Sequence, residues 1–246
     1  MNNLNKFTGN WGLISKYRSA LMGFAAIFII IFHTTLYCSD IYPLDTFINV
    51  LFFRVMNCFN IGVEIFLFVS GVGLYFAYEK KPQFKTYYIK RILNVYLIFF
   101  FVNIFKYFFY DILILKNDAK TFIEDLFGLN FIFGRNNSGW YVVFAMILYL
   151  VYPLIYQITK KLEGHKYNTL IWFSFIFLWF VFLILIRNTE FYNTYEIGLT
   201  RFPIFLFGCY CGSLVKNKQN LKWWIYAAAI AGFIARTYVI YDNRLI

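Results

Sequence analysis

The chain alternates long apolar runs with short polar segments. Runs near the length of about 20 residues that lets a helix cross a bilayer can be drawn at residues 20–37, 61–78, 92–110, 140–158, 170–186, 197–215 and 223–240. The apolar stretch from Phe47 to Phe59 is interrupted by Asn49, Arg54 and Asn57, so we interpret it as an interfacial or re-entrant segment. The pattern predicts an all-α fold, a polytopic transmembrane helical bundle with about seven spans.

Composition supports a membrane protein and argues against a soluble domain. Hydrophobic residues make up 61% of the chain and aromatic residues 24%, whereas only 14% are charged, and the mean hydropathy is +0.60. These values lie well outside the balance of soluble globular domains. We therefore expect an integral protein of a bacterial-type plasma membrane, with the first apolar run acting as a signal anchor.

Lysine and arginine concentrate in alternate connections between the runs. They precede the first run and recur in segments 79–91, 159–169 and 216–222, whereas the other connections mix few basic residues with acidic ones. Short basic loops resist translocation, so we expect the amino terminus and the basic segments to be cytoplasmic and Ile246 to be outside. The formal charge of +11 then anchors the chain to anionic lipid, and nucleic acid is not an expected partner.

The first two apolar runs each contain an ionisable residue, His33 in the first and Glu64 in the second. Placing an ionisable side chain in hydrocarbon costs free energy, so such residues indicate a functional site by default. A neutral imidazole can also accept a proton near pH 7. Structural alternatives stand beside this: a hydrogen bond from a neighbouring helix would satisfy His33, and an ion pair, for example with Arg201, would satisfy Glu64. The sequence has no pattern of metal ligands, since His165 is the only other histidine and no Cys-x-x-C occurs.

Five blocks of the sequence resemble the membrane-bound acyltransferase type 3 family, whose members O-acylate sugars of surface polysaccharides, peptidoglycan and exported glycans. The blocks are Lys16–Ala26 leading to Phe32-His33, then Gly62–Gly71, Tyr87–Leu93, Gly139-Trp140-Tyr141 with Tyr149 and Pro153, and Arg201-Phe202-Pro203 with Phe205 and Gly208. They occur in the family's order along almost the whole chain. Family members have more spans, so the resemblance implies that residues 1–246 form one acyltransferase-type domain lacking C-terminal spans.

The resemblance implies roles for eight residues. His33 would handle the proton or the acyl group with Glu64 orienting it, Lys90, Arg91 and Arg18 would bind the acyl-coenzyme A donor, and Trp140, Tyr141 and Arg201 would bind the acceptor. The arginine that usually precedes the first-span glycine is Met22 here, and Arg18, one turn earlier, is the candidate to replace it.

The donor and acceptor candidates also have purely structural interpretations. Lys90 and Arg91 belong to the positive-inside signal. Trp140 and Tyr141 lie where aromatic residues anchor helices at the membrane interface, and Arg201 could extend to that interface from the start of its span.

The sequence thus predicts a membrane O-acyltransferase that transfers an acyl group, with acetyl expected, from acyl-coenzyme A to a hydroxyl of a cell-surface or exported carbohydrate. Acyl-coenzyme A is a co-substrate, no cofactor is permanently bound, and the partners are membrane lipid and the carbohydrate. Two alternatives remain open: a transporter of a glycan or lipid-linked intermediate, and an inactive fragment that serves as an assembly partner. The oligomeric state is left open.

Overall fold

The structure is a computed structural model that describes residues 9–41, 46–135, 139–222 and 225. Within these residues the regular secondary structure is helical, and a single isolated bridge joins Asn10 to Asn220. The prediction of an all-α fold is therefore confirmed.

The helices follow one another along the chain with short connections. They are α1 (Gly12–Lys16), α2 (Arg18–Ile41), α3 (Phe47–Asn57), the 3₁₀ turn η2 (Cys58–Ile61), α4 (Gly62–Lys80), α5 (Phe84–Arg91), the π-helical η3 (Ile92–Tyr96), α6 (Leu97–Tyr107), the π-helical η4 (Phe108–Ile114), α7 (Ala119–Phe127), α8 (Leu129–Ile132), α9 (Trp140–Leu162), α10 (Asn168–Ile186), α11 (Glu190–Leu199) and α12 (Phe202–Lys216).

Six helical runs are long and apolar enough to cross a membrane. They are Arg18–Cys38, Ile48–Lys80, Phe84–Ile114, Trp140–Leu162, Asn168–Ile186 and Glu190–Lys216. Each contains one of the first six predicted spans, so the chain is a polytopic integral membrane protein. The seventh predicted span, 223–240, lies outside the described residues.

The segment 47–59, predicted to be interfacial or re-entrant, is not separate from the span that follows it. Helix α3 continues through η2 into α4, and the run from Ile48 to Lys80 has 33 residues. At 1.5 Å per residue it measures about 50 Å, which exceeds the roughly 30 Å of a bilayer's hydrocarbon core. The polar residues do not end the helix, since its backbone hydrogen bonds are internal and Asn57 is buried in the bundle.

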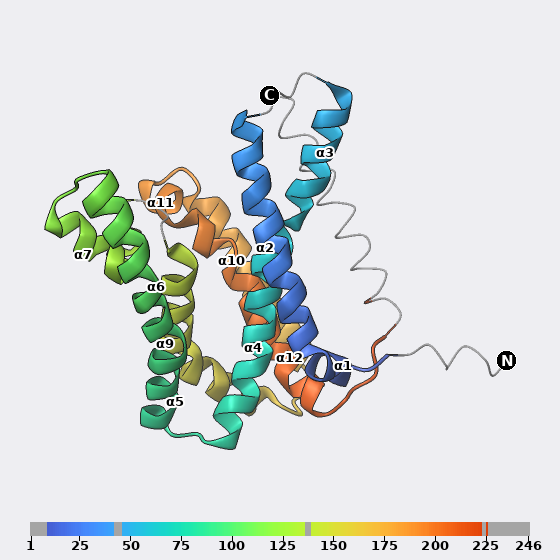
Figure 1. Cartoon of the computed structure of the whole chain (residues 1–246). Coiled ribbons are helices and arrows are strands. Elements are labelled where there is room, and N and C mark those ends of the chain that lie inside the picture. Colours follow the sequence, from blue (N-terminus) through green and yellow to red (C-terminus); the bar gives the residue numbers. More distant parts are fainter. Residues whose placement is uncertain (1–8, 42–45, 136–138, 223–224, 226–246) are drawn as a thin grey trace.

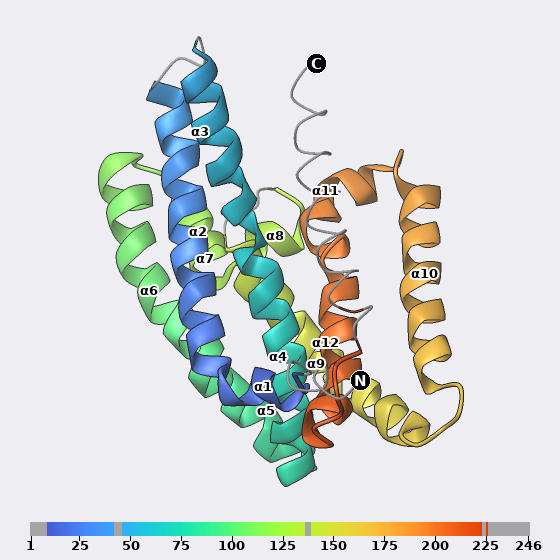
Figure 2. The same cartoon turned by 90° about the vertical axis from the view of Figure 1, so that its right-hand side faces the viewer.

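The lysine-rich segments gather at one end of the bundle. Figure 1 shows α1, α5 and the last turn of α4 at this end, and α7 and α11 at the other. We call the end that carries Lys80, Lys81, Lys160 and Lys216 the basic end, and the other the opposite end. In Figure 2, α4, α9 and α12 lie between α6 on one side and α10 on the other.

Helices α4 and α12 run parallel and touch through their backbones. A Cβ atom on Gly71 would lie 2.7 Å from the carbonyl oxygen of Phe205, a Cβ on Gly208 would collide with the carbonyl of Phe68, and one on Gly212 would collide with Tyr75. Lipid tails are as apolar as leucine, so membrane helices associate through close packing and small residues at the contact. The Gly208-x-x-x-Gly212 spacing supplies that contact at the centre of the bundle.

We expect Gly208→Ala to destabilise the protein, because its new methyl group forces α12 away from α4. Overpacking of this kind costs about 1–3 kcal/mol, so the thermal unfolding midpoint of the purified protein in detergent should fall. Gly23→Ala is the matched control, since a Cβ at Gly23 on α2 meets no atom within 4 Å. Equal midpoints for the two variants would contradict the backbone contact.

Candidate functional site

Three of the predicted site residues meet at the opposite end. The Nε atom of Arg201 lies 3.5 Å from Oε1 of Glu64, and its guanidinium stacks 5.3 Å from the ring centre of Trp140. Arg201 also donates a hydrogen bond from Nη1 to the carbonyl of Ile197 at 2.9 Å. We call Glu64, Trp140 and Arg201 the Arg201 cluster.

Local backbone features place each member of the cluster at a helix start. Glu64 is in the first turn of α4, and Trp140 begins α9 directly after Gly139, whose φ of +65° is a conformation that glycine adopts without strain. Arg201 lies at the break between α11 and α12, where Pro203 fits the first turn of the new helix because that turn needs no amide donor. The same break brings Arg201 beside α4.

Two cavities adjoin at Arg201. One, of about 290 Å³, is polar and is lined by Asn193, Thr194, Glu196, Ile197, Thr200 and Arg201. The other, of about 620 Å³, lies between α10 and α12. Its lining includes Glu64, Thr200 and Arg201 near the first cavity and Gln219, Asn220 and Lys222 farther away. The Oε2 atom of Glu64 is buried without a hydrogen bond among the described residues, so the cluster has acceptor capacity left for a ligand.

His33 and Tyr141 do not join the Arg201 cluster. His33 is exposed on α2, and its ring packs edge-on against Phe32 at 5.5 Å. Glu64 is paired with Arg201 instead, which was the alternative interpretation of that carboxylate. Tyr141 packs against Phe66 of α4 at 6.2 Å, so it contributes to the α4–α9 interface. A catalytic role for His33 stays a prediction.

Lys90 and Arg91 line a cavity of about 280 Å³ at the basic end, together with Ala77, Lys80, Lys81, Thr86 and Tyr87. The guanidinium of Arg91 lies between two rings, 5.4 Å from that of Tyr87 and 5.5 Å from that of Tyr149. Four cations around so small a space create a positive potential that favours anions. The rings hold the Arg91 fork in one orientation, which suits recognition of phosphate.

Arg18 lies outside this basic cavity. It is exposed, and its guanidinium lies beside Gly73 of α4, where a Cβ would be 3.1 Å from Nη2. The absence of a side chain at Gly73 makes room for the arginine. Among the described residues, the structure brings Lys90 and Arg91 together but places the third donor candidate on a different surface.

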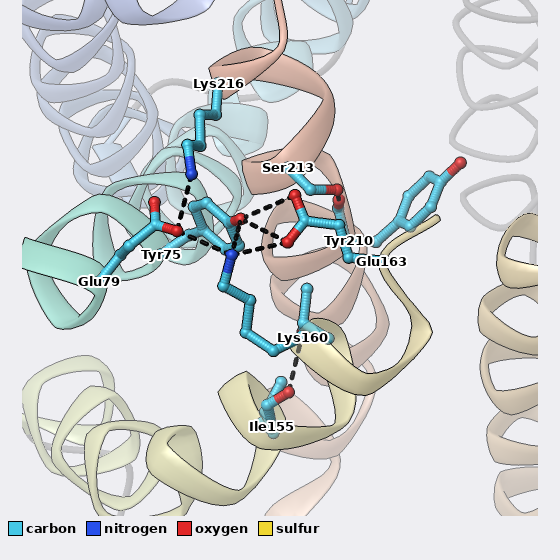
Figure 3. A network of polar contacts seen from close by, with 9 residues as sticks. Tyr75, Glu79, Ile155, Lys160, Glu163, Tyr210, Ser213 and Lys216 are labelled. Atoms are coloured by element: carbon cyan, nitrogen blue, oxygen red, sulfur yellow. Dashed lines mark hydrogen bonds and ion pairs between the residues drawn. The ribbon is translucent and has the colours of Figure 1, made fainter. Parts of the chain in front are cut away.

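Sequence reasoning missed a network of polar contacts at the basic end (Figure 3). The ammonium of Lys160 lies 2.7 Å from Glu79, 2.6 Å from Glu163 and 3.1 Å from the hydroxyl of Tyr75. Lys216 adds an ion pair to Glu79 at 2.8 Å. The network joins α4, α9 and α12, and the residues on different helices are too far apart in sequence for a local pattern to reveal it. The i, i+3 spacing of Lys160 and Glu163 was its one local signal.

Glu163 contributes to the pH dependence of this network. Burial tends to raise the pKa of its carboxyl, but the hydrogen bonds from Lys160 and Tyr75 outweigh that effect and hold the pKa below its usual value. A lowered folded-state pKa stabilises the fold above the unfolded pKa, and this contribution is lost as the pH falls through the folded pKa.

Comparison with known families identifies the chain. The helical architecture and apolar surface define an integral membrane protein. The family model described as an acyltransferase domain matches residues 20–242, and the chain belongs to this acyltransferase 3 family, which implies acyltransferase activity. Neither a curated protein nor a solved structure matches the chain.

We expect Glu163→Gln to lower stability at pH 7 by about 1 kcal/mol, near the upper end for a partly exposed ion pair. The unfolding midpoint of the wild type in detergent should approach that of the variant as the pH is lowered from 7 to about 3, through the lowered pKa of Glu163, because protonation removes the same charge. Glu190→Gln, at an exposed glutamate that starts α11, is the control. A constant difference between wild type and Glu163→Gln across this range would contradict the assignment.

Proposed function

We propose that the protein is a membrane O-acyltransferase that takes an acyl group, acetyl in the first instance, from acyl-coenzyme A at the basic end and delivers it to a carbohydrate hydroxyl at the opposite end. One observation carries the proposal. In a chain of the acyltransferase 3 family, a cationic cavity at Lys90 and Arg91 and a polar cavity at Arg201 lie at opposite ends of the same bundle.

The basic cavity suits the phosphates of coenzyme A. Coenzyme A carries a 3′-phosphate and a pyrophosphate at one end and the thioester at the end of a long flexible arm. Phosphates bound by Lys90 and Arg91 would therefore leave the thioester free to reach into the bundle. Because lysine-rich segments usually face the cytoplasm, the proposal puts this cavity on the side where the donor is made.

The polar cavity suits an acceptor rich in hydroxyl groups. Asn193, Thr194 and Glu196 supply donors and acceptors on one wall, and Arg201 supplies a cation at its base. Glu64 lines the neighbouring cavity, and a hydroxyl donating to its Oε2 there would satisfy an acceptor that lacks a hydrogen bond among the described residues. Transfer then requires a base that removes the hydroxyl proton as the oxygen attacks the thioester carbon and the coenzyme A thiolate leaves.

His33 is the residue we assign to that proton. It is one of the chain's two histidines and the one that lies in a candidate span, about 22 Å along α2 from Arg18 at 1.5 Å per residue. A neutral imidazole at this depth can take the hydroxyl proton and return it to the leaving thiolate.

The donor site is tested by replacing Lys90 and Arg91 with glutamine. Loss of two phosphate-binding cations should weaken coenzyme A binding to the purified protein at least about tenfold, or about 1.4 kcal/mol, as measured by calorimetry. Dephospho-coenzyme A, which lacks the 3′-phosphate, should distinguish wild type from variant less. Lys161→Gln with Lys166→Gln is the control, because both lysines are exposed and outside the cavity. Unchanged coenzyme A affinity would contradict the donor site and would leave Lys90 and Arg91 as part of the positive-inside signal alone.

The reaction is tested by His33→Gln. Loss of a general base typically lowers the rate by about 10²–10⁴, so transfer of labelled acetyl from acetyl-coenzyme A to membrane carbohydrate should nearly vanish while expression and membrane insertion stay normal. His165→Gln should keep full activity, because that histidine is exposed between α9 and α10. Retained transfer in His33→Gln would exclude the base assignment, and absence of transfer by the wild type would exclude the proposed function.

A further inference from the structure

A buried polar cluster lies at the opposite end and lines none of the three cavities described above. It lies where the third candidate span, Phe84–Ile114, ends and packs against α7 and α8, and Figure 1 shows α7 at this end. Its members are Asn103 on α6, Asp111 on η4, Asp125 on α7 and Asn130 on α8, and all four are buried, with Asp111 only 2% exposed. We call these four residues the Asp111 cluster.

Two carboxylates meet inside this cluster. The carboxyl groups of Asp111 and Asp125 lie within hydrogen-bonding reach of each other. Nδ2 of Asn130 donates a hydrogen bond to Oδ1 of Asp125 at 2.6 Å, and Nδ2 of Asn103 donates one to the backbone carbonyl of Asp125 at 3.4 Å. These bonds hold both the side chain and the backbone of Asp125, so its carboxylate stays beside that of Asp111.

The two carboxylates lack a cationic partner. Among the described residues, neither Asp111 nor Asp125 forms an ion pair, and Oδ2 of Asp111 is buried without a hydrogen bond. Lys106 is one turn away, but it is exposed and its ammonium donates to the hydroxyl of Tyr107 at 3.2 Å. Buried carboxylates are normally paired with a cation or coordinate a metal. Adjacent carboxylates also repel each other, so they must share either a proton or a cation.

The available ligand atoms favour Ca²⁺ as that cation. Ca²⁺ takes about six to eight oxygen ligands in a flexible arrangement, whereas Mg²⁺ demands a nearly ideal octahedron. No three histidine, cysteine or acidic side chains gather in the described part of the chain, so amide and water oxygens must complete the shell. Nδ2 of Asn117 lies 3.5 Å from Oδ1 of Asp111, and turning that amide over would present its oxygen instead. Asn117 is partly exposed, so water and ions can reach the pair there.

We propose that Asp111 and Asp125 bind a Ca²⁺ ion, which joins the end of the third candidate span to α7 and α8. The ion removes the repulsion between the two carboxylates and satisfies the unpaired oxygen of Asp111. This site is independent of the proposed acyltransferase reaction. Because lysine-rich segments usually face the cytoplasm, we expect the opposite end to face outward, where free Ca²⁺ is most abundant.

The site also supports one wall of the polar cavity at Arg201. Helix α8 contacts α11 through Tyr195, whose hydroxyl donates a hydrogen bond to the carbonyl of Ile132 at 2.7 Å and whose ring packs edge-on against Phe131 at 5.8 Å. The preceding residue, Thr194, lines that cavity. An ion that fixes α7 and α8 therefore also fixes the position of α11.

The test measures thermal unfolding of the purified full chain in non-ionic detergent after divalent ions have been removed. A ligand that binds only the folded state raises its stability by mass action, so CaCl₂ should raise the unfolding midpoint by at least about 2 °C. NaCl of equal ionic strength should not reproduce that rise. Asp111→Asn should lose it, because the variant removes one of two charged ligands.

Glu124→Gln is the matched control. It removes the neighbouring carboxylate of α7, which pairs with Arg135 outside the cluster, and it should keep the rise with CaCl₂. An equal rise in Asp111→Asn and Glu124→Gln, an equal rise with NaCl, or no rise in the wild type would overturn the proposal.

A binding measurement on the wild type does not depend on the folding of any variant. Equilibrium dialysis with radioactive Ca²⁺ should show a bound ion that Glu124→Gln retains and that Asp125→Asn binds at least tenfold more weakly. If the two carboxylates instead share a proton, the wild type should bind no Ca²⁺, and Asp111→Asn should unfold at the same midpoint with or without CaCl₂. That outcome would overturn the calcium site.

Discussion

The backbone contact between α4 and α12 sets the register on which both polar ends of the bundle depend. Gly71 meets Gly208, and Tyr75 meets Gly212. The ion pairs Glu64–Arg201 and Glu79–Lys216 have the same offset in sequence, 137 residues. Two parallel helices held at their glycines therefore bring acidic residues of α4 opposite cations of α12 at both ends, because a rigid pair of helices keeps one register along its length.

This register separates the two halves of the proposed reaction by a fixed distance. Glu64 and Glu79 are fifteen residues apart on α4, or about 22 Å at 1.5 Å per residue. The two cavities at Arg201 begin at the first pair, and the basic cavity begins at Lys80, just beyond the second. Between them the helix pair is closely packed. Helix α2 runs beside α4 with Arg18 next to Gly73 and Ala25 next to Gly62, so His33 lies beyond the Glu64 end of this stretch.

Side chains at the basic end and at the opposite end are oriented by residues from distant parts of the chain. Arg91 was recognisable as a cation beside a helix, yet its orientation comes from Tyr87, one turn away, and from Tyr149, on another helix. Glu64 was recognisable as a costly carboxylate, but two partners were equally compatible with its sequence. The structure pairs it with Arg201 and leaves His33 on the exposed face of α2. The polar segment 47–59 extends a helix because its buried asparagine faces the bundle.

The sequence by itself determined the class of fold, the first six spans and the gathering of lysines at one end. Span length and loop charge are local properties of the sequence, and membrane insertion depends on them directly. The five family blocks likewise marked Trp140, Arg201, Lys90 and Arg91 as site candidates. Only the tertiary structure decided which of them meet, that Tyr75, Lys160 and Glu163 form a network, and that a polar and an apolar cavity adjoin at Arg201. These features depend on helix packing between residues far apart in the chain, and no local pattern encodes that register.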